Sequence, residues 1–238
     1  MGLKKYIITG DIIEVYDYKN YVKGNGGARV RGEATEEAKQ INYSNTNQRR
    51  RDTIRRLACC NFDNKYDKFL TLTFADNKTN VIECNILFKA FIRKLKLKYN
   101  SNLKYLAVIE FQQRGAVHYH VLLDIPFVPQ EKLQELWGHG FVFINAISHV
   151  DNIGAYIVKY MTKDNKDTRL MGLQAYLHSR NLRKPEKILN HDLKEFDKLE
   201  KKIYVKYNLN DLKPEYEANF TSQIMGECNY KQYNLKRG

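Results

Sequence analysis

Between residues 68 and 147, six stretches of regular hydrophobic pattern follow one another with short connections. Four of them are rich in apolar, β-branched and aromatic residues, which is typical of strands. The other two repeat apolar residues every three or four positions, as helices do. In chain order they are residues 68–74 (strand), 80–98 (helix), 103–111 (strand), 116–124 (strand), 129–137 (helix) and 140–147 (strand).

This order is that of the ferredoxin-like (βαββαβ) pattern, so we expect an α+β fold with a central antiparallel sheet. One more helix, within residues 152–164, follows the last strand. We expect residues 1–45 to be a β-rich N-terminal extension and residues 46–185 to be the main domain. Residues 186–238 would be a basic C-terminal extension packed on the same domain, with a helix near 186–203.

The chain of 238 residues is strongly basic, with 40 Lys and Arg against 27 Asp and Glu and a formal net charge of +13. Such a balance favours a polyanionic partner, and nucleic acid first among these. No apolar run approaches the roughly 20 residues that a membrane span needs. The start of the chain carries acidic residues where a signal peptide is apolar, and the four cysteines form no CxxC pair. We therefore expect a cytoplasmic protein with reduced thiols and no membrane partner.

A basic helix is expected after residue 44, where Ser44 or Asn45 could provide the N-cap. Its arginines could simply form a solvated face, but the net charge favours contact with phosphates. They are Arg49, Arg50, Arg51, Arg55 and Arg56.

The stretch "GAVHYHVLLD" places two histidines on one face of a strand, because side chains alternate between the two faces. A hairpin turn with Gly115 in a left-handed conformation would pair residues whose numbers sum to 228. Glu110 then lies opposite His118, and Val108 opposite His120. Glu110, His118 and His120 would converge as ligands for a divalent ion such as Mn²⁺, Zn²⁺ or Mg²⁺. The alternative is two partly exposed histidines on a solvent-facing sheet.

The last helix contains the pattern Tyr-x-x-Lys twice, four residues apart. At about 100° per residue, the two phenols and two ammonium groups lie on a stripe separate from the apolar one. The tyrosines could be a simple packing pair. Adjacent cations and a metal-polarised phosphate would instead make them nucleophiles. The residues are Tyr156, Lys159, Tyr160 and Lys163.

Three stretches in this order, "FLTLTF", "HYH" and "YIVKYMTK", resemble the motifs of the HUH endonuclease superfamily. They are most similar to those of two-tyrosine rolling-circle replication initiators of small phages and bacterial plasmids. The resemblance covers about residues 45–185. It implies an HUH fold in which His118, His120 and the upstream Glu110 bind Mn²⁺ or Mg²⁺.

In that family, a tyrosine attacks single-stranded origin DNA and forms a 5′-phosphotyrosyl link with a free 3′-hydroxyl. The resemblance makes Tyr156 and Tyr160 the nucleophiles, with Lys159 and Lys163 assisting. We slightly favour Tyr160 as the first nucleophile, because a lysine precedes it and another follows three residues later. The second tyrosine would allow a further cleavage and the rejoining of ends.

No G-x-x-x-x-G-K-[ST] motif occurs in the chain, so we expect no nucleotide cofactor. A host helicase and DNA polymerase would then be partners, in the cytoplasm of a bacterial cell. Two other functions fit the same residues. One is an HUH transposase or nickase, and the other is a non-catalytic nucleic-acid-binding module of ferredoxin-like shape.

Overall fold

A computed structural model of the chain describes residues 3–19, 35–62, 67–161, 169–189, 193–222 and 226–237. The chain divides into two compact units. Residues 33–183 form what we call the central unit, and residues 1–32 with 184–238 form the terminal unit. Both units contain an antiparallel sheet, and five α-helices are assigned among the described residues. None of these helices has both the length and the apolar character needed to cross a bilayer.

The central unit contains a five-stranded sheet in the order β6-β3-β5-β4-β7, with every neighbouring pair antiparallel. Its elements follow the order expected from the sequence between residues 68 and 158, and each expected strand and helix is present. Their bounds are β3 Lys68–Thr73, α2 Val81–Lys98, β4 Tyr105–Phe111, β5 Val117–Leu123, α3 Gln130–Trp137, β6 Val142–Ala146, α4 Ile153–Val158 and β7 Tyr176–His178.

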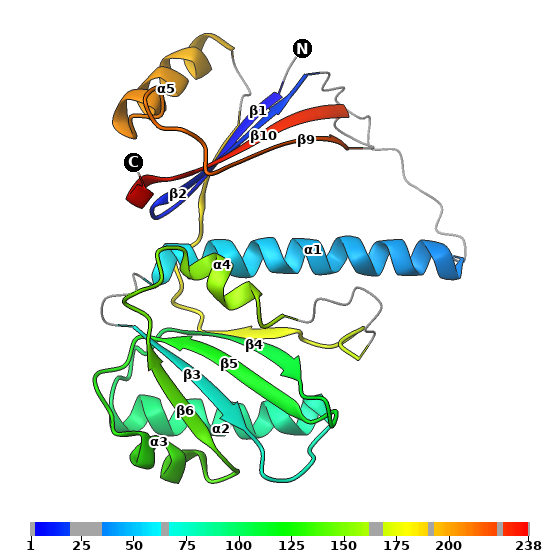
Figure 1. Cartoon of the computed structure of the whole chain (residues 1–238), viewed down its shortest axis with the longest axis vertical. Helices are drawn as coiled ribbons and strands as arrows, with labels where there is room; N and C mark the ends of the chain where they lie inside the picture. Colours follow the sequence, from blue (N-terminus) through cyan, green and yellow to red (C-terminus); the bar gives the residue numbers. More distant parts are fainter. Residues whose placement is uncertain are drawn as a thin grey trace. The chain divides into compact units, whose positions relative to one another are not determined.

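The two faces of this sheet are covered by different helices (Figure 1). Leu70, Leu72 and Phe74 point to the face that packs on α2 and α3. Phe69, between them in the alternation of β3, points to the other face, which packs on α4 and on α1 (Glu36–Asn61). The histidines of β5 belong to this second face, because Val117, Tyr119 and Val121 are buried against α2 and α3.

Helix α1 begins earlier than the sequence predicted. Its N-cap is Thr35, whose hydroxyl accepts a hydrogen bond of 3.2 Å from the Ala38 N–H, and not Ser44 or Asn45. Glu36 and Glu37 in the first turn favour this start, because carboxylates stabilise the positive end of the helix dipole. Residues 36–45, which we expected in a β-rich extension, are therefore helical. The expected strand within residues 20–34 lies outside the described residues.

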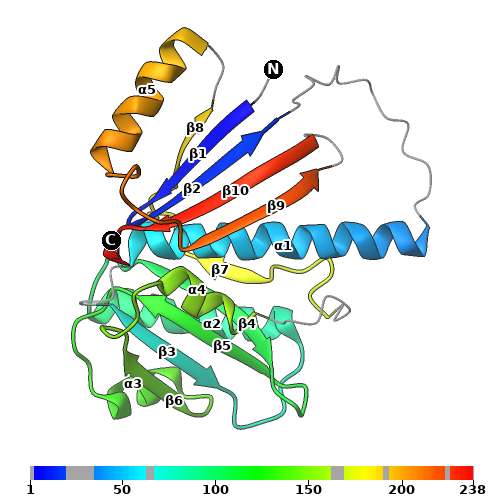
Figure 2. The ribbon, with the colours of Figure 1, turned by 45° about the horizontal axis from the view of Figure 1, so that its top comes forward.

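Helix α1 packs closely against α4 at Gly154. A Cβ atom at this position would lie 2.5 Å from the Arg55 carbonyl oxygen and 2.6 Å from Cys59 Sγ. Glycine therefore allows the two backbones to approach more closely than any other residue would. Both views of the ribbon show the two helices side by side (Figure 2).

The terminal unit brings the two ends of the chain into one sheet, in the order β8-β1-β2-β10-β9. Tyr6, Ile13 and Val15 on one face of this sheet pack with Phe196 and Ile203 of α5. The bounds of its elements are β1 Leu3–Thr9, β2 Ile12–Tyr18, β8 Glu186–Leu189, α5 Leu193–Lys206, β9 Tyr216–Ser222, β10 Gly226–Asn234 and a 3₁₀ turn Leu235–Arg237.

The C-terminal part of the chain thus differs from the sequence prediction in two ways. Residues 184–238 form a unit with the N-terminal strands, whereas we expected residues 186–238 to pack on the main domain. The helix expected at 186–203 begins only at Leu193, because Glu186–Leu189 pairs with β1 as a strand. Pairing between distant segments overrides local helical tendency here.

Candidate functional site

The hairpin of β4 and β5 has the register that the sequence predicted. Glu110 pairs with His118 and Val108 with His120. The turn is closed by hydrogen bonds from Gln112 N–H to the Ala116 carbonyl (2.9 Å) and from Gly115 N–H to the Gln112 carbonyl (2.8 Å). Gly115 has φ of +85°, a left-handed conformation that few other residues adopt. This turn fixes which side chains of the two strands share a face.

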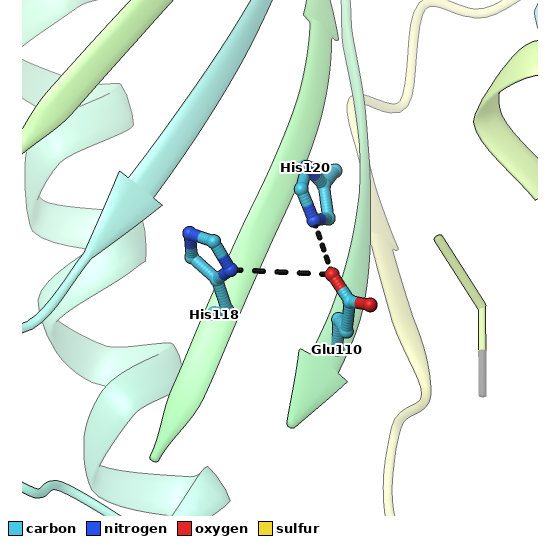
Figure 3. Close-up of side chains that lie close together, drawn as sticks. All are labelled: Glu110, His118 and His120. Atoms are coloured by element: carbon cyan, nitrogen blue, oxygen red, sulfur yellow. Dashed lines mark hydrogen bonds and ion pairs between the residues drawn. The ribbon is translucent and has the colours of Figure 1, made fainter. Parts of the chain in front are cut away.

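Glu110, His118 and His120 converge on that face (Figure 3). One ligand atom from each residue lies within 4.8 Å of the others. Glu110 Oε2 lies 2.6 Å from His120 Nε2 and 4.0 Å from His118 Nδ1. We refer to these three residues as the triad.

Two threonines of β3 contact the far side of both imidazoles. Thr71 Oγ1 lies 3.2 Å from His120 Nδ1, and Thr73 Oγ1 lies 2.9 Å from His118 Nε2. The pairing of β3 with β5 sets each threonine directly opposite its histidine. The nitrogens that face Glu110 are thereby left for a ligand, while the opposite nitrogens can donate to the hydroxyl oxygens.

Burial keeps the triad histidines neutral. It lowers the pKa of both His118 and His120 to about 4, and the neighbouring His120 contributes to the shift of His118. Burial also raises the pKa of Glu110, against the opposing effect of His118. At neutral pH, the short contact between Glu110 and His120 is a hydrogen bond that a neutral imidazole donates from Nε2. In the other tautomer, Nδ1 donates to Thr71 and Nε2 instead offers its lone pair to a cation.

The donor set fits a divalent metal ion. Two imidazole nitrogens and one carboxylate oxygen, with bonds of about 2.1 Å each, would lie within about 4.2 Å of one another around an ion. The observed limit of 4.8 Å requires only a small rotation of the side chains. Glu110 is the most exposed of the three, with 41 % of its side chain accessible, so the site can be reached from solvent.

The tyrosine pair lies beside the triad. The ring of Tyr160 lies on that of His120, with centroids 3.9 Å apart, and both tyrosine rings contact Phe69 at 5.1 Å. The Tyr160 hydroxyl donates to the Tyr156 hydroxyl at 3.2 Å. Burial and this hydrogen bond raise the pKa of Tyr160, so it is protonated at neutral pH.

The tyrosines are less separate from the apolar residues of their helix than predicted. Both pack partly buried with Ile153 and Ile157, in the core between the sheet, α1 and α4. Helix α4 ends at Val158, and Tyr160 follows in a turn where its N–H donates to the Ile157 carbonyl at 3.2 Å. Packing on Phe69 and His120 therefore contributes to the position of Tyr160.

Lys159 lies one helical turn after Tyr156, and its Nζ is 5.6 Å from the centroid of the Tyr156 ring. The Lys159 side chain is exposed. Tyr160 as the first nucleophile stays a prediction. Lys163 lies outside the described residues.

The arginines of α1 do not form one face. Ile54, Leu57 and Ala58 make the buried side of the helix, Arg50 lies on that same side one turn earlier, and the other four arginines lie on its two flanks. Arg50 donates to the Asn47 side chain at 3.1 Å, and Arg55 lies 3.8 Å from the Asp52 carboxylate. Arg49 is exposed, whereas Arg51 and Arg56 are half-buried.

Sequence reasoning missed Thr71, Thr73 and Phe69 as parts of the site. The alternation of "FLTLTF" places all three on one strand face, which was a usable signal. It did not show that this face meets the histidines, because the register of β3 on β5 joins segments almost 50 residues apart.

Residues 67–165 match the model of a family described as replication-associated protein ORF2/G2P. The chain is thus similar to this family over somewhat less than half of its length. The matched range contains the triad, both tyrosines and both lysines, whereas α1 and its arginines precede it. The chain matches none of the curated proteins and none of the solved structures with which it was compared.

Proposed function

We propose that this chain initiates rolling-circle replication by nicking single-stranded origin DNA through a tyrosine. The observation that carries the proposal is the contact between the Tyr160 ring and His120, which places two phenols beside three convergent metal ligands. The similarity of residues 67–165 to a replication-associated family supports the same role.

The proposed fold is a ferredoxin-like HUH domain. The strand order β6-β3-β5-β4 corresponds to the fourth, first, third and second strands of the βαββαβ pattern, all antiparallel. Helix α4 then follows the fourth strand, and Tyr156 within it and Tyr160 in the turn after it lie on the face that bears the triad. This arrangement agrees with the motif order that we compared with two-tyrosine initiators.

In this proposal, Glu110, His118 and His120 hold Mn²⁺ or Mg²⁺, with Thr71 and Thr73 orienting the two imidazoles. A divalent ion bound there would polarise the oxygens of the scissile phosphate. The low pKa values of the histidines keep both rings available as ligands at neutral pH.

One tyrosine oxygen attacks the phosphorus, and the bond between phosphorus and the 3′-oxygen breaks. The phenol loses its proton to solvent or a nearby base, and the leaving 3′-oxygen takes up a proton. The products are a 5′-phosphotyrosyl link and a free 3′-hydroxyl, from which a host polymerase would extend after a host helicase unwinds the duplex. Because the hydroxyls of Tyr156 and Tyr160 are 3.2 Å apart, either can approach the same phosphate.

The positive charge of the chain would hold the DNA. We propose that the α1 arginines contact phosphates, with Arg49 and Arg56 on one flank of the helix and Arg51 and Arg55 on the other. The logarithm of the single-strand binding constant falls linearly with the logarithm of the salt concentration. Replacing Arg49 and Arg56 with Ala should make this slope shallower by about 0.7 for each lost phosphate contact. An unchanged slope in a salt titration would show that this flank does not touch DNA.

The function is tested by incubating the whole chain with pooled single-stranded oligonucleotides and Mn²⁺, followed by mass spectrometry of any peptide–DNA adduct. We expect an adduct on Tyr156 or Tyr160. His118→Ala should lower the cleavage rate by about a thousandfold, because the ion contributes several kcal/mol. His149→Ala, at an exposed histidine, is the matched control and should cleave normally. DNA binding without any adduct would overturn the proposal in favour of a non-catalytic binding module.

A further inference from the structure

A second cationic feature lies on the central unit, away from the triad. A cleft of about 520 Å³ opens between α2 and the segment that contains β7. Lys89, Arg93 and Lys96 of α2 line one wall, and His178 and Arg180 line the other. No acidic side chain is among the lining residues.

The three cations of α2 are spaced to act together. Positions 89, 93 and 96 follow i, i+4, i+7 spacing, so they lie in one row on the helix surface. Seven residues of α-helix span about 10 Å, which is more than a single phosphate group occupies. A row of this length suits a polyanion with repeated charges.

These cations have no ion-pair partner in the part of the chain that the structure describes. None of the four Lys and Arg side chains of the cleft forms an ion pair with a carboxylate among the residues that the structure describes. Lys96 acts electrostatically on Asp124, and that carboxylate accepts a hydrogen bond from the Lys104 N–H. The repulsion between like charges in one cleft is therefore left to be relieved by an anion from outside.

The second wall of the cleft is held in place by hydrogen bonds to β4 and to Asn102. Ser179 Oγ accepts from the Tyr105 N–H at 3.1 Å, and the Ser179 N–H donates to the Tyr105 carbonyl at 3.0 Å. Asn181 is fixed by hydrogen bonds to Asn102 of 2.7 and 2.8 Å. Fixed walls of this kind favour binding, because little side-chain order is lost when a ligand arrives.

The cleft cannot be part of the cleavage site. Tyr105 lines the cleft and is the neighbour of Leu106 in β4, so the two side chains point to opposite faces of the sheet. Leu106 is on the face of Glu110. Tyr105 and Glu110 are also five residues apart, or about 17 Å along the strand. The α2 wall and Tyr105 therefore lie on the sheet face opposite the triad, whereas His178, which pairs with Leu106, lies at the β7 edge on the face of the triad. The cleft is thus at the β7 edge of the sheet and toward the opposite end of β4 from Glu110.

We propose that this cleft is a second nucleic-acid site that binds the phosphodiester backbone of DNA outside the cleaved segment. A row of cations without a row of exposed rings binds phosphates and not bases, so the contact is independent of sequence. Such a site would hold flanking DNA, either single-stranded or duplex, while another segment lies at the triad. The proposal adds to the proposed nicking function but does not depend on it.

The test measures DNA binding by fluorescence anisotropy in EDTA, with a single-stranded 30-mer and a hairpin duplex as separate probes. The variant Lys89→Ala/Arg93→Ala/Lys96→Ala should weaken binding of at least one probe about 10- to 100-fold at 0.1 M salt. For the single-stranded probe, the dependence of log binding constant on log salt concentration should become shallower by about 2. This corresponds to three lost phosphate contacts at about 0.7 each. The probe with the larger loss identifies the form of DNA that the cleft holds.

The matched control is Lys198→Ala/Lys201→Ala/Lys202→Ala, which removes the same charge from exposed positions of α5. Arg180→Ala, at an exposed position of the other wall, should lower the slope by about 0.7 and provides a second test if the triple variant does not fold. Unchanged binding of both probes, or an equal loss in the α5 control, would overturn the proposal. Because the assay requires no cleavage, this result is distinct from failure of the nicking function.

Discussion

The triad and the tyrosine pair lie on the same sheet face but are held in place differently. The triad stands on paired strands, where a hairpin turn sets the register and two threonines hold the rings. The tyrosines stand at the end of a six-residue helix, and their rings depend on Phe69, His120 and each other. The triad side chains are thus positioned by backbone pairing, whereas the two tyrosines are positioned mainly by side-chain packing.

This difference suits the proposed chemistry. A metal site needs ligand atoms at fixed separations, which a sheet provides. Two tyrosines that act in turn must each reach a phosphate, and a short helix end permits small movements that a strand would not. Four changes test whether the two parts are as separable as this comparison implies.

The largest effect is expected at the tyrosines. Tyr156→Phe/Tyr160→Phe should form no adduct, because both phenol oxygens are lost while both rings remain. At least one single variant should still form an adduct, but neither should complete cleavage and rejoining. Metal affinity should be unchanged in all three. The measurement is adduct mapping by mass spectrometry, with Tyr99→Phe as the control.

An adduct in the double variant would exclude both tyrosines as nucleophiles. A lowered metal affinity in that variant would show that the tyrosine rings hold the triad in place, and the separation of the two parts would fail.

A second change moves the tyrosines without touching them. Gly154→Ala would place Cβ 2.5 Å from the Arg55 carbonyl oxygen and so push α4 away from α1. Overpacking of this kind costs about 1–3 kcal/mol of stability. A displacement of about 1 Å at the nucleophile can cost about a hundredfold in rate. Single-turnover cleavage should fall by that order, with metal affinity within a few-fold of the wild type.

The matched control for Gly154→Ala is Gly172→Ala, because a Cβ atom there meets nothing within 4 Å, although its positive φ adds some strain. Equal loss of cleavage in both variants would show that general destabilisation, and not displacement of α4, causes the effect.

A third change affects the triad alone. Thr71→Val and Thr73→Val keep the shape of the side chain but remove the oxygen that each imidazole contacts. We expect metal affinity to fall about 10- to 100-fold, as is typical when the partner of a ligating histidine is lost. Isothermal titration with Mn²⁺ measures this, and Thr79→Val, at an exposed threonine, is the control. Cleavage at saturating Mn²⁺ should recover; a loss that saturating metal does not restore would contradict a purely positioning role.

The smallest effect concerns pH. The folded protein holds His118 and His120 at pKa values of about 4, below the ordinary 6.5, so between these pH values the unfolded chain binds more protons. Stability of the metal-free protein should therefore fall as pH drops from about 6.5 towards 4, partly offset by the raised pKa of Glu110. At about 2–4 °C per kcal/mol, the melting temperature should decrease by several degrees.

The comparison for this measurement is His118→Asn/His120→Asn, whose melting temperature should depend less on pH over the same range. The same pH dependence in both proteins would show that the triad histidines do not titrate as the structure implies.

The sequence was sufficient to predict the elements between residues 68 and 158 and the convergence of the triad, because both depend on local signals. Hydrophobic periodicity located each strand and helix between residues 68 and 158, and Gly115 set the hairpin register that joins Glu110 to His118. A turn and two adjacent strands involve few residues, so their pairing can be counted along the chain.

Only the tertiary structure decided the rest. It brought Thr71 and Thr73 to the histidines, laid Tyr160 on His120, and joined both ends of the chain in a second sheet through β1, β2, β8 and β10. Each of these contacts links residues roughly 40 or more positions apart. Their free energy comes from burial and from pairing between distant strands, which local sequence pattern does not encode. Local sequence thus determined which residues form the triad, whereas long-range packing set the neighbours that orient them.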